Sequence, residues 1–222
     1  MFRAKADFYT SLLYLLLSWV AYFVMYRLTE RIPIENCHRI HGVLDDRIPF
    51  CEWFVVFYVG WYLLIALTLG WFLVSDVAAF RKLQTYILLT QTIATIVYIL
   101  YPNYQDLRPA FFPRENLFTT ILAMIYRLDT PTGVCPSLHV AVSIGIASAW
   151  IRKQDAPLWL RVGIAVFCLG VCLSVAFVKQ HSVVDMIAAI PVCAFAEWFV
   201  YFRRLQSGHF NAKIPSKGGE IP

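Results

Sequence analysis

The sequence predicts an all-α polytopic membrane protein: a bundle of six transmembrane helices with a short interfacial helix in the loop after the third span. Of the 222 residues, 59% are hydrophobic and only 15% are charged, so the chain is more apolar than ordinary soluble domains. Six predominantly apolar stretches are each long enough, at about 20 residues, to cross a hydrocarbon core of roughly 30 Å. Because these runs lack the in-out alternation of barrel strands, helices are the spanning structure they favour.

The predicted spans follow one another without a linker or an internal repeat, so we expect one domain, 1–222, with its core at 83–202. The first run is too long and too aromatic for a cleaved signal peptide, and no small-x-small cleavage site follows it. We therefore expect it to remain as a span. The six predicted spans are Phe8–Tyr26, Trp53–Ser75, Leu83–Tyr101, Val134–Ile151, Val162–Val178 and Met186–Phe202.

The distribution of basic residues favours one orientation of this bundle. With a cytoplasmic amino terminus, eleven of the nineteen basic residues fall in cytoplasmic segments, and the others are mixed with acids on the outer side. We predict that both termini are cytoplasmic and that 207–222 is a mobile tail. The net charge of +5 therefore reflects topology, and it does not indicate nucleic-acid binding because the aromatic residues lie in spans.

The first outer loop, Arg27–Phe50, is polar. Its histidines, His38 and His41, are interpreted as solvated loop residues, with metal ligation as the alternative. Cys37 and Cys51 bracket the polar part of the loop, and a disulfide between them is one possibility in an extracellular segment.

The second outer connection, Pro102–Gly133, contains the apolar stretch Leu117–Leu128, which is too short to span a bilayer. Asn116 could cap this stretch as a helix. An interfacial helix resting on lipid and a loop helix packed on the bundle fit the pattern equally well.

Three polar residues at the outer ends of the last spans form the candidate catalytic group. His181 and Asp185 are four residues apart, so they share one face of a helix, and the carboxylate can hold one ring nitrogen while the other points outward. His139 stands at the amino end of the fourth span, where free N–H groups favour an anion. Ionisable groups at membrane depth are costly, so this group is a functional-site hypothesis.

Arg108 adds a planar guanidinium, which suits phosphate oxygens, in the same outer region. Two histidines, one with a carboxylate partner, together with a guanidinium and a helix amino terminus suit phosphoryl transfer without a metal or another cofactor. One histidine would attack the phosphorus, and the other would protonate the leaving oxygen.

At these residues the chain resembles the type-2 phosphatidic acid phosphatase superfamily of six-helix membrane enzymes. Their second motif, Pro-Ser-x-His, is complete at 136–139, and the third, Ser-Arg-x5-His-x3-Asp, matches at Ser174, His181 and Asp185. The first, Lys-x6-Arg-Pro, matches at Arg108 and Pro109. The order of the motifs and their positions relative to the spans also agree.

The resemblance implies that His181 is the nucleophile that forms a phosphohistidine, that Asp185 orients it, and that His139 is the general acid. Arg108 and Ser137 would bind the phosphate, and Ser174 is counted with them, although it could instead bond a backbone carbonyl.

Two motif cations are replaced, by Tyr101 and by Val175. Lys179 is the first candidate to substitute for them, with Arg114 and Arg127 as weaker ones. These departures are more similar to the branch that contains inositol phosphorylceramide synthases and related bacterial membrane proteins.

The expected function is hydrolysis of a lipid phosphate, of the phosphatidic acid or isoprenoid pyrophosphate type, at the outer face of a bacterial plasma membrane. The alternative within the same superfamily is transfer of a phosphoryl headgroup, such as inositol phosphate, to a lipid alcohol. Two further alternatives are a metal-dependent membrane hydrolase that uses His139, His181, Asp185 and Cys135 as ligands, and a non-catalytic carrier with a proton-relay pair.

Overall fold

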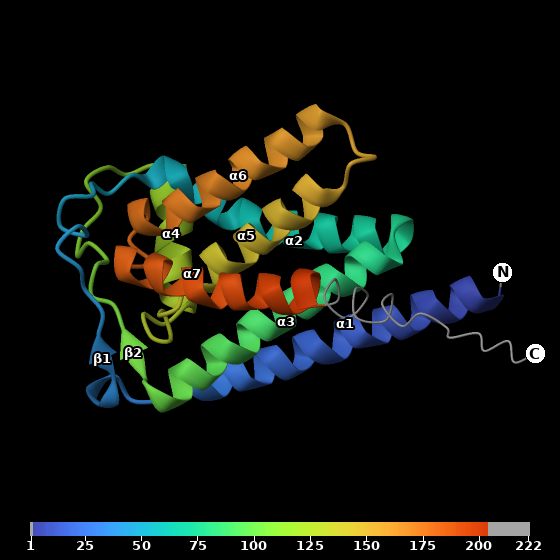
Figure 1. The fold of residues 1–222 in the computed structure, drawn as a ribbon. Coiled ribbons are helices and arrows are strands. Elements are labelled where there is room, and N and C mark those ends of the chain that lie inside the picture. Colours follow the sequence, from blue (N-terminus) through green and yellow to red (C-terminus); the bar gives the residue numbers. More distant parts are fainter. Residues whose placement is uncertain (1, 204–222) are drawn as a thin grey trace, which may run out of the picture.

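The structure is a computed structural model that describes residues 2–203, and in it the chain is almost entirely helical (Figure 1). The predicted tail at 207–222 lies outside the described residues. The helices are α1 (Phe2–Thr29), α2 (Val55–Ser75), α3 (Val77–Leu100), α4 (Leu117–Leu128), α5 (Leu138–Arg152), α6 (Leu158–Phe177) and α7 (Val183–Glu197). Two single 3₁₀ turns, η1 (Ile34–Asn36) and η2 (Glu52–Phe54), and a π-helical turn, η3 (Trp198–Phe202), complete the helical elements.

Five helices are long and apolar enough to cross a membrane: α1, α2 with η2, α3, α6, and α7 with η3. These correspond to five of the six predicted spans. The remaining prediction, Val134–Ile151, begins too early, because α5 starts at Leu138 and has only 15 residues. At a rise of about 1.5 Å per residue α5 is roughly 22 Å long, which is shorter than the hydrocarbon core.

Asn103 explains why α5 begins late. Its side-chain oxygen accepts hydrogen bonds from the backbone N–H groups of Val134 (2.8 Å) and Cys135 (2.9 Å), and its amide donates to the Cys135 carbonyl (3.0 Å). The side chain of Ser137 then caps the helix by accepting from Val140 N–H. The bends that precede α5 are therefore held in place by a residue that lies just after α3.

The core of the bundle is formed around α5, which packs against α3, α6 and α7. Gly145 allows the close approach of α3, since a Cβ at this position would lie 2.3 Å from the ring of Tyr86. The Tyr86 hydroxyl donates to the Ala141 carbonyl (3.2 Å), one turn earlier on the same helix. Small residues at such contacts bring membrane helices close together.

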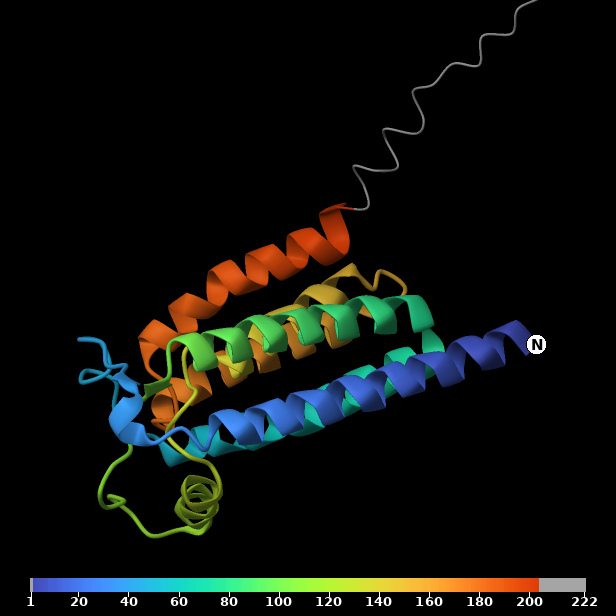
Figure 2. The ribbon, with the colours of Figure 1, turned by 90° about the horizontal axis from the view of Figure 1, so that it is seen from below.

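Helix α1 lies at the edge of the bundle, and it packs mainly on α3 (Figures 1 and 2). A buried hydrogen bond joins the two helices, from the Gln84 amide to the Ser18 hydroxyl (2.7 Å). At the end where α1 begins, Arg81 donates to the Ser11 hydroxyl (2.9 Å). The start of α1, the α2–α3 turn, the α5–α6 turn and the end of η3 lie at one end of the bundle, and the long connections lie at the other.

The long connections meet in a two-residue parallel ladder, in which β1 (His38–Arg39) pairs with β2 (Asn103–Tyr104). Cys37 and Cys51 are both free cysteines, so the disulfide that the sequence allowed is absent. Cys37 lies just before β1, and the Cys51 N–H donates to the Phe177 carbonyl at the end of α6.

Helix α4 has the predicted boundaries and the predicted cap, since the Asn116 side chain accepts from the N–H groups of Phe118 and Thr119. It crosses the direction of the long helices and is seen almost end-on in Figure 2. Leu122 is fully buried against the bundle, whereas Leu117 and Leu128 are exposed.

Candidate active site

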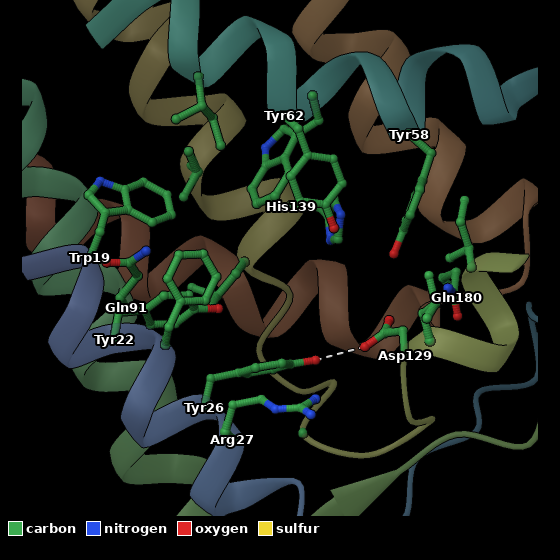
Figure 3. A pocket seen from close by; sticks show the side chains of 18 of the residues that line it. Trp19, Tyr22, Tyr26, Arg27, Tyr58, Tyr62, Gln91, Asp129, His139 and Gln180 are labelled. Atoms are coloured by element: carbon green, nitrogen blue, oxygen red, sulfur yellow. Dashed lines mark hydrogen bonds between the residues drawn. The ribbon is translucent and has the colours of Figure 1, made fainter. Parts of the chain in front are cut away.

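A cavity of about 1060 Å³ lies between α1, α2, α3, α4 and α5. Figure 3 looks into it, with Trp19, Tyr22 and Gln91 at one side and Asp129 and Gln180 at the other. Its polar end contains both predicted histidines, while most of its length is lined by apolar side chains of α1 and α2. These apolar residues include Leu15, Leu16, Trp19, Val20 and Phe23 of α1 and Val59, Ile65, Ala66 and Leu69 of α2.

His181 lies in the turn between α6 and α7, and one of its two ring nitrogens is fixed. Nδ1 is 3.0 Å from the Val134 carbonyl oxygen and 3.2 Å from Oδ2 of Asp185. Because a carbonyl oxygen can only accept, Nδ1 carries a proton, and in the neutral ring Nε2 has the lone pair. The predicted pairing of His181 with Asp185 is therefore present, and it leaves the second nitrogen as a potential nucleophile.

Asp185 is completely buried and serves two partners at once. Its Oδ2 also accepts from the Ser182 N–H (2.9 Å), which closes a capping box at the start of α7. The backbone carbonyl of Asp185 accepts from Ser137 N–H (3.1 Å), and this bond ties the start of α7 to the start of α5. The bond thereby fixes the position of His139, at the start of α5, relative to His181, just before α7.

His139 follows the α5 cap and is enclosed by aromatic rings of α2. Its ring lies 4.5 Å from that of Tyr58 and 4.2 Å from that of Trp61, and 5.5 Å from the His181 ring between centroids. Within residues 2–203 its side chain makes no hydrogen bond, and Nε2 is buried. The aromatic contacts fix the position of the imidazole beside His181.

Asp45, which was not among the predicted site residues, fixes the start of α7. Its buried carboxylate accepts from the hydroxyl of Ser182 (2.5 Å), from Val183 N–H (2.8 Å) and from Gly42 N–H (2.7 Å). The amino end of α7 is thus occupied by protein carboxylates. No sequence signal indicates this contact, because Asp45 lies in a polar loop more than 130 residues before the helix.

Lys179 is directed away from the cavity, contrary to the expectation that it supplies a phosphate-binding cation. Its ammonium group donates to the carbonyl oxygens of Asp45 (2.8 Å) and Ile48 (2.6 Å), and its backbone adopts a positive φ of 54°. Partial burial lowers the pKa of this amine. Lys179 therefore holds the loop between α1 and α2 against the α6–α7 turn.

Arg108 lies near the polar end of the cavity, but protein groups occupy most of its donors. Nε and Nη2 donate to Oε1 of Gln180 (2.9 and 2.6 Å), and Nη1 donates to the carbonyl oxygens of Tyr126 (3.1 Å) and Asp129 (3.0 Å). The guanidinium also covers the ring of Tyr126 at 4.8 Å. A bidentate contact with phosphate would require breaking these bonds.

The remaining predicted residues have structural contacts. Ser137 is buried as the α5 cap, and the Ser174 hydroxyl donates to the Val171 carbonyl (2.7 Å) inside α6. Arg114 pairs with the buried carboxylate of Glu52 (3.0 Å). Neither Arg114 nor Arg127 lines the cavity.

Asp129 and Gln180, which were not among the predicted site residues, also line the polar end of the cavity. Oδ1 of Asp129 accepts from the Tyr26 hydroxyl (2.7 Å), a bond drawn in Figure 3, and Oδ2 lies 4.0 Å from Arg108. Burial raises the pKa of the Asp129 carboxyl above its ordinary value. The only sequence signals were the position of Gln180 beside His181 and that of Asp129 immediately after α4.

The described part of the chain holds no group of three metal-ligating side chains. Comparisons with known protein families, with curated proteins and with solved structures find no match for this chain.

Proposed function

We propose that the protein is a membrane enzyme that transfers the phosphoryl group of a lipid through a phosphohistidine on His181. The supporting observation is the position of the histidine pair, 5.5 Å apart, at the polar end of a cavity that is otherwise apolar. A lipid phosphate matches such a cavity, because its apolar chain fits the apolar part and its charged phosphate fits the polar end.

The chemistry follows from the ring contacts. Nε2 of His181 attacks the phosphorus, and the new N–P bond replaces the P–O bond to the leaving group, whose oxygen takes a proton from His139. The resulting phosphoimidazolium keeps its Nδ1 proton between Val134 and Asp185. In the second step the oxygen of water or of a lipid alcohol attacks the phosphorus, and its proton returns to His139. The new P–O bond replaces the N–P bond, so His181 is released.

The shape of the cavity supports entry from the bilayer. It extends along α2 from Tyr58 to Gly70, which is roughly 18 Å of helix, and α1 forms the opposite wall. In this arrangement α5 completes a bundle of six membrane helices, and α4 rests at the outer interface through Leu117, Met124 and Leu128. The phosphate would then be handled at the outer leaflet, with both termini in the cytoplasm.

Hydrolysis of a lipid phosphate and transfer of a headgroup-bearing phosphate share the first step, and one observation favours transfer. The charged residues that line the described cavity are Arg27, Glu30 and Asp129, and Arg27 is paired with Glu30 at 2.8 Å. A dianionic phosphate monoester would meet a carboxylate without a free cation to balance it. A phosphodiester has one negative charge and is easier to accommodate.

The test is to incubate purified protein with labelled phosphatidic acid, an isoprenoid pyrophosphate or phosphatidylinositol, with and without diacylglycerol or ceramide. Free phosphate would indicate a phosphatase, and a new phosphodiester would indicate a transferase. The His181→Ala variant should be inactive in either case. Activity that EDTA abolishes and zinc restores would instead favour a metal-dependent hydrolase, and transport without turnover in both proteins would favour a carrier.

A further inference from the structure

The contact between Arg108 and Gln180 determines the orientation of the Gln180 amide. Two guanidinium nitrogens, Nε and Nη2, converge on its Oε1 at 2.9 and 2.6 Å. A guanidinium has only donors, so the atom that faces it must be the amide oxygen. The NH₂ group of Gln180 consequently points away from Arg108.

This NH₂ group is a buried donor whose partner is missing from the described residues. The Gln180 side chain is only 2% exposed, and it lines the cavity that also contains His139 and His181. Nε2 of His139, at the same polar end, is likewise buried without a partner. Most buried polar groups in proteins are satisfied, so two such atoms beside one imidazole suggest a ligand that supplies acceptors to both.

The backbone holds Gln180 firmly beside the proposed nucleophile. The N–H groups of Gln180 and His181 both donate to the Val175 carbonyl, at 2.9 and 3.0 Å. The turn therefore fixes the backbone of Gln180, and Arg108 fixes its side-chain amide. A donor prepared in this way does not need to be reoriented when negative charge develops on a substrate.

We propose that the Gln180 amide donates a hydrogen bond to a non-bridging phosphoryl oxygen during attack by His181. Arg108 acts through Gln180 as a positioning residue, because its two donors hold and polarise the amide. This inference rests on the proposed phosphoryl-transfer function. It places a neutral donor at an anion site where Lys179 points away and Arg108 is already engaged.

The test compares kcat and KM of Gln180→Glu with those of the wild type. Glutamate has the same shape and still offers an oxygen to Arg108, so the variant should fold, but it places negative charge where the donor was. Removal of one such donor should lower kcat by about 100-fold and change KM little. Orthovanadate, which adopts the five-coordinate geometry of phosphoryl transfer, should stabilise the wild type against heat and fail to stabilise the variant.

Gln154→Glu is the matched control. The Gln154 oxygen also accepts from an arginine, Arg161 (3.1 Å), but it lies in the α5–α6 turn at the other end of the bundle. This variant should keep wild-type kcat and vanadate stabilisation. A second variant, Gln180→Asn, keeps the amide but shortens the side chain, and it should lower kcat about tenfold.

The outcomes separate this inference from the proposed function. If both Gln180 variants keep kcat and vanadate stabilisation within about threefold while His181→Ala is inactive, the role of Gln180 is refuted and the function stands. A rise in KM alone, with unchanged kcat, also refutes it. If the wild type neither turns over a phospholipid nor binds vanadate, the proposed function fails, and the inference fails with it.

Discussion

Replacement of Asp185 by asparagine tests whether the carboxylate stabilises positive charge on His181. In the proposed mechanism a phosphohistidine with a protonated Nδ1 makes the ring cationic, and Oδ2 of Asp185 lies 3.2 Å from that nitrogen. Two unit charges at this separation attract by about 5 kcal/mol at an effective dielectric constant of roughly 20. Both charges are delocalised, so we take about half of this value, which corresponds to a loss of roughly 100-fold in kcat.

The same substitution should leave the local fold intact. The asparagine oxygen can still accept from Ser182 N–H, and the Val134 carbonyl still accepts from Nδ1 at 3.0 Å, so the tautomer of His181 is retained. KM and the melting temperature should therefore change little. The assay is steady-state turnover of the best lipid substrate by purified protein in vesicles.

Asp76→Asn is the control for this experiment. Asp76 also caps a helix, since its carboxylate accepts from Ala79 N–H (3.0 Å), but it pairs with Lys153 (2.8 Å) at the other end of the bundle. It should retain full activity. If Asp185→Asn keeps more than about one third of the wild-type kcat while His181→Ala is inactive, the electrostatic reasoning is wrong.

Three further predictions concern the cavity, the loop between α1 and α2, and pH. A Cβ at Gly70 or at Gly163 meets no atom within 4 Å, but of the two only Gly70 lines the cavity. Gly70→Leu should therefore lower kcat/KM for long-chain lipids about tenfold, and Gly163→Leu should leave it unchanged. Asp45→Ala removes three hydrogen bonds from a buried carboxylate and should lower the free energy of unfolding by about 2–3 kcal/mol, measured by thermal denaturation. The pKa of His41 is raised by its hydrogen bond to Asp106, so the stability from this pair should be complete below about pH 6.5 and lost as the pH rises through the raised pKa. Melting temperatures between pH 6 and 9 should show this loss in the wild type and not in His41→Gln.

Each of these predictions has an outcome that would contradict it. Equal chain-length profiles for Gly70→Leu and Gly163→Leu would place the lipid chain outside the cavity. Asp45→Ala should be compared with Asp155→Ala, which alters an exposed side chain, and equal melting temperatures would show that the α7 cap is unimportant. Identical pH profiles for the wild type and His41→Gln would assign the pH dependence to another group.

Many elements of the fold were predictable because the signals that define them are local. Five of the six predicted spans are apolar helices long enough to cross a membrane, and α4 begins and ends at the predicted residues. Helix length, apolar content and an asparagine cap can each be read within one segment. The pairing of His181 with Asp185 was also predictable, because four residues along a helix return to the same face. The start of α5 was missed because it depends on Asn103, about 30 residues earlier.

The sequence by itself determined an apolar helical bundle and the chemical types at its candidate site, because hydropathy and helical spacing are properties of short stretches. Only the tertiary structure decided where the charged side chains point. Arg108 was predicted as the phosphate ligand of the first motif and Lys179 as a replacement for the missing cations. Carbonyl oxygens of one distant loop bind Lys179, and Gln180, Tyr126 and Asp129 bind Arg108. A long cationic side chain is directed by whichever acceptors the fold brings within about 3 Å, and those acceptors lie far away in the sequence.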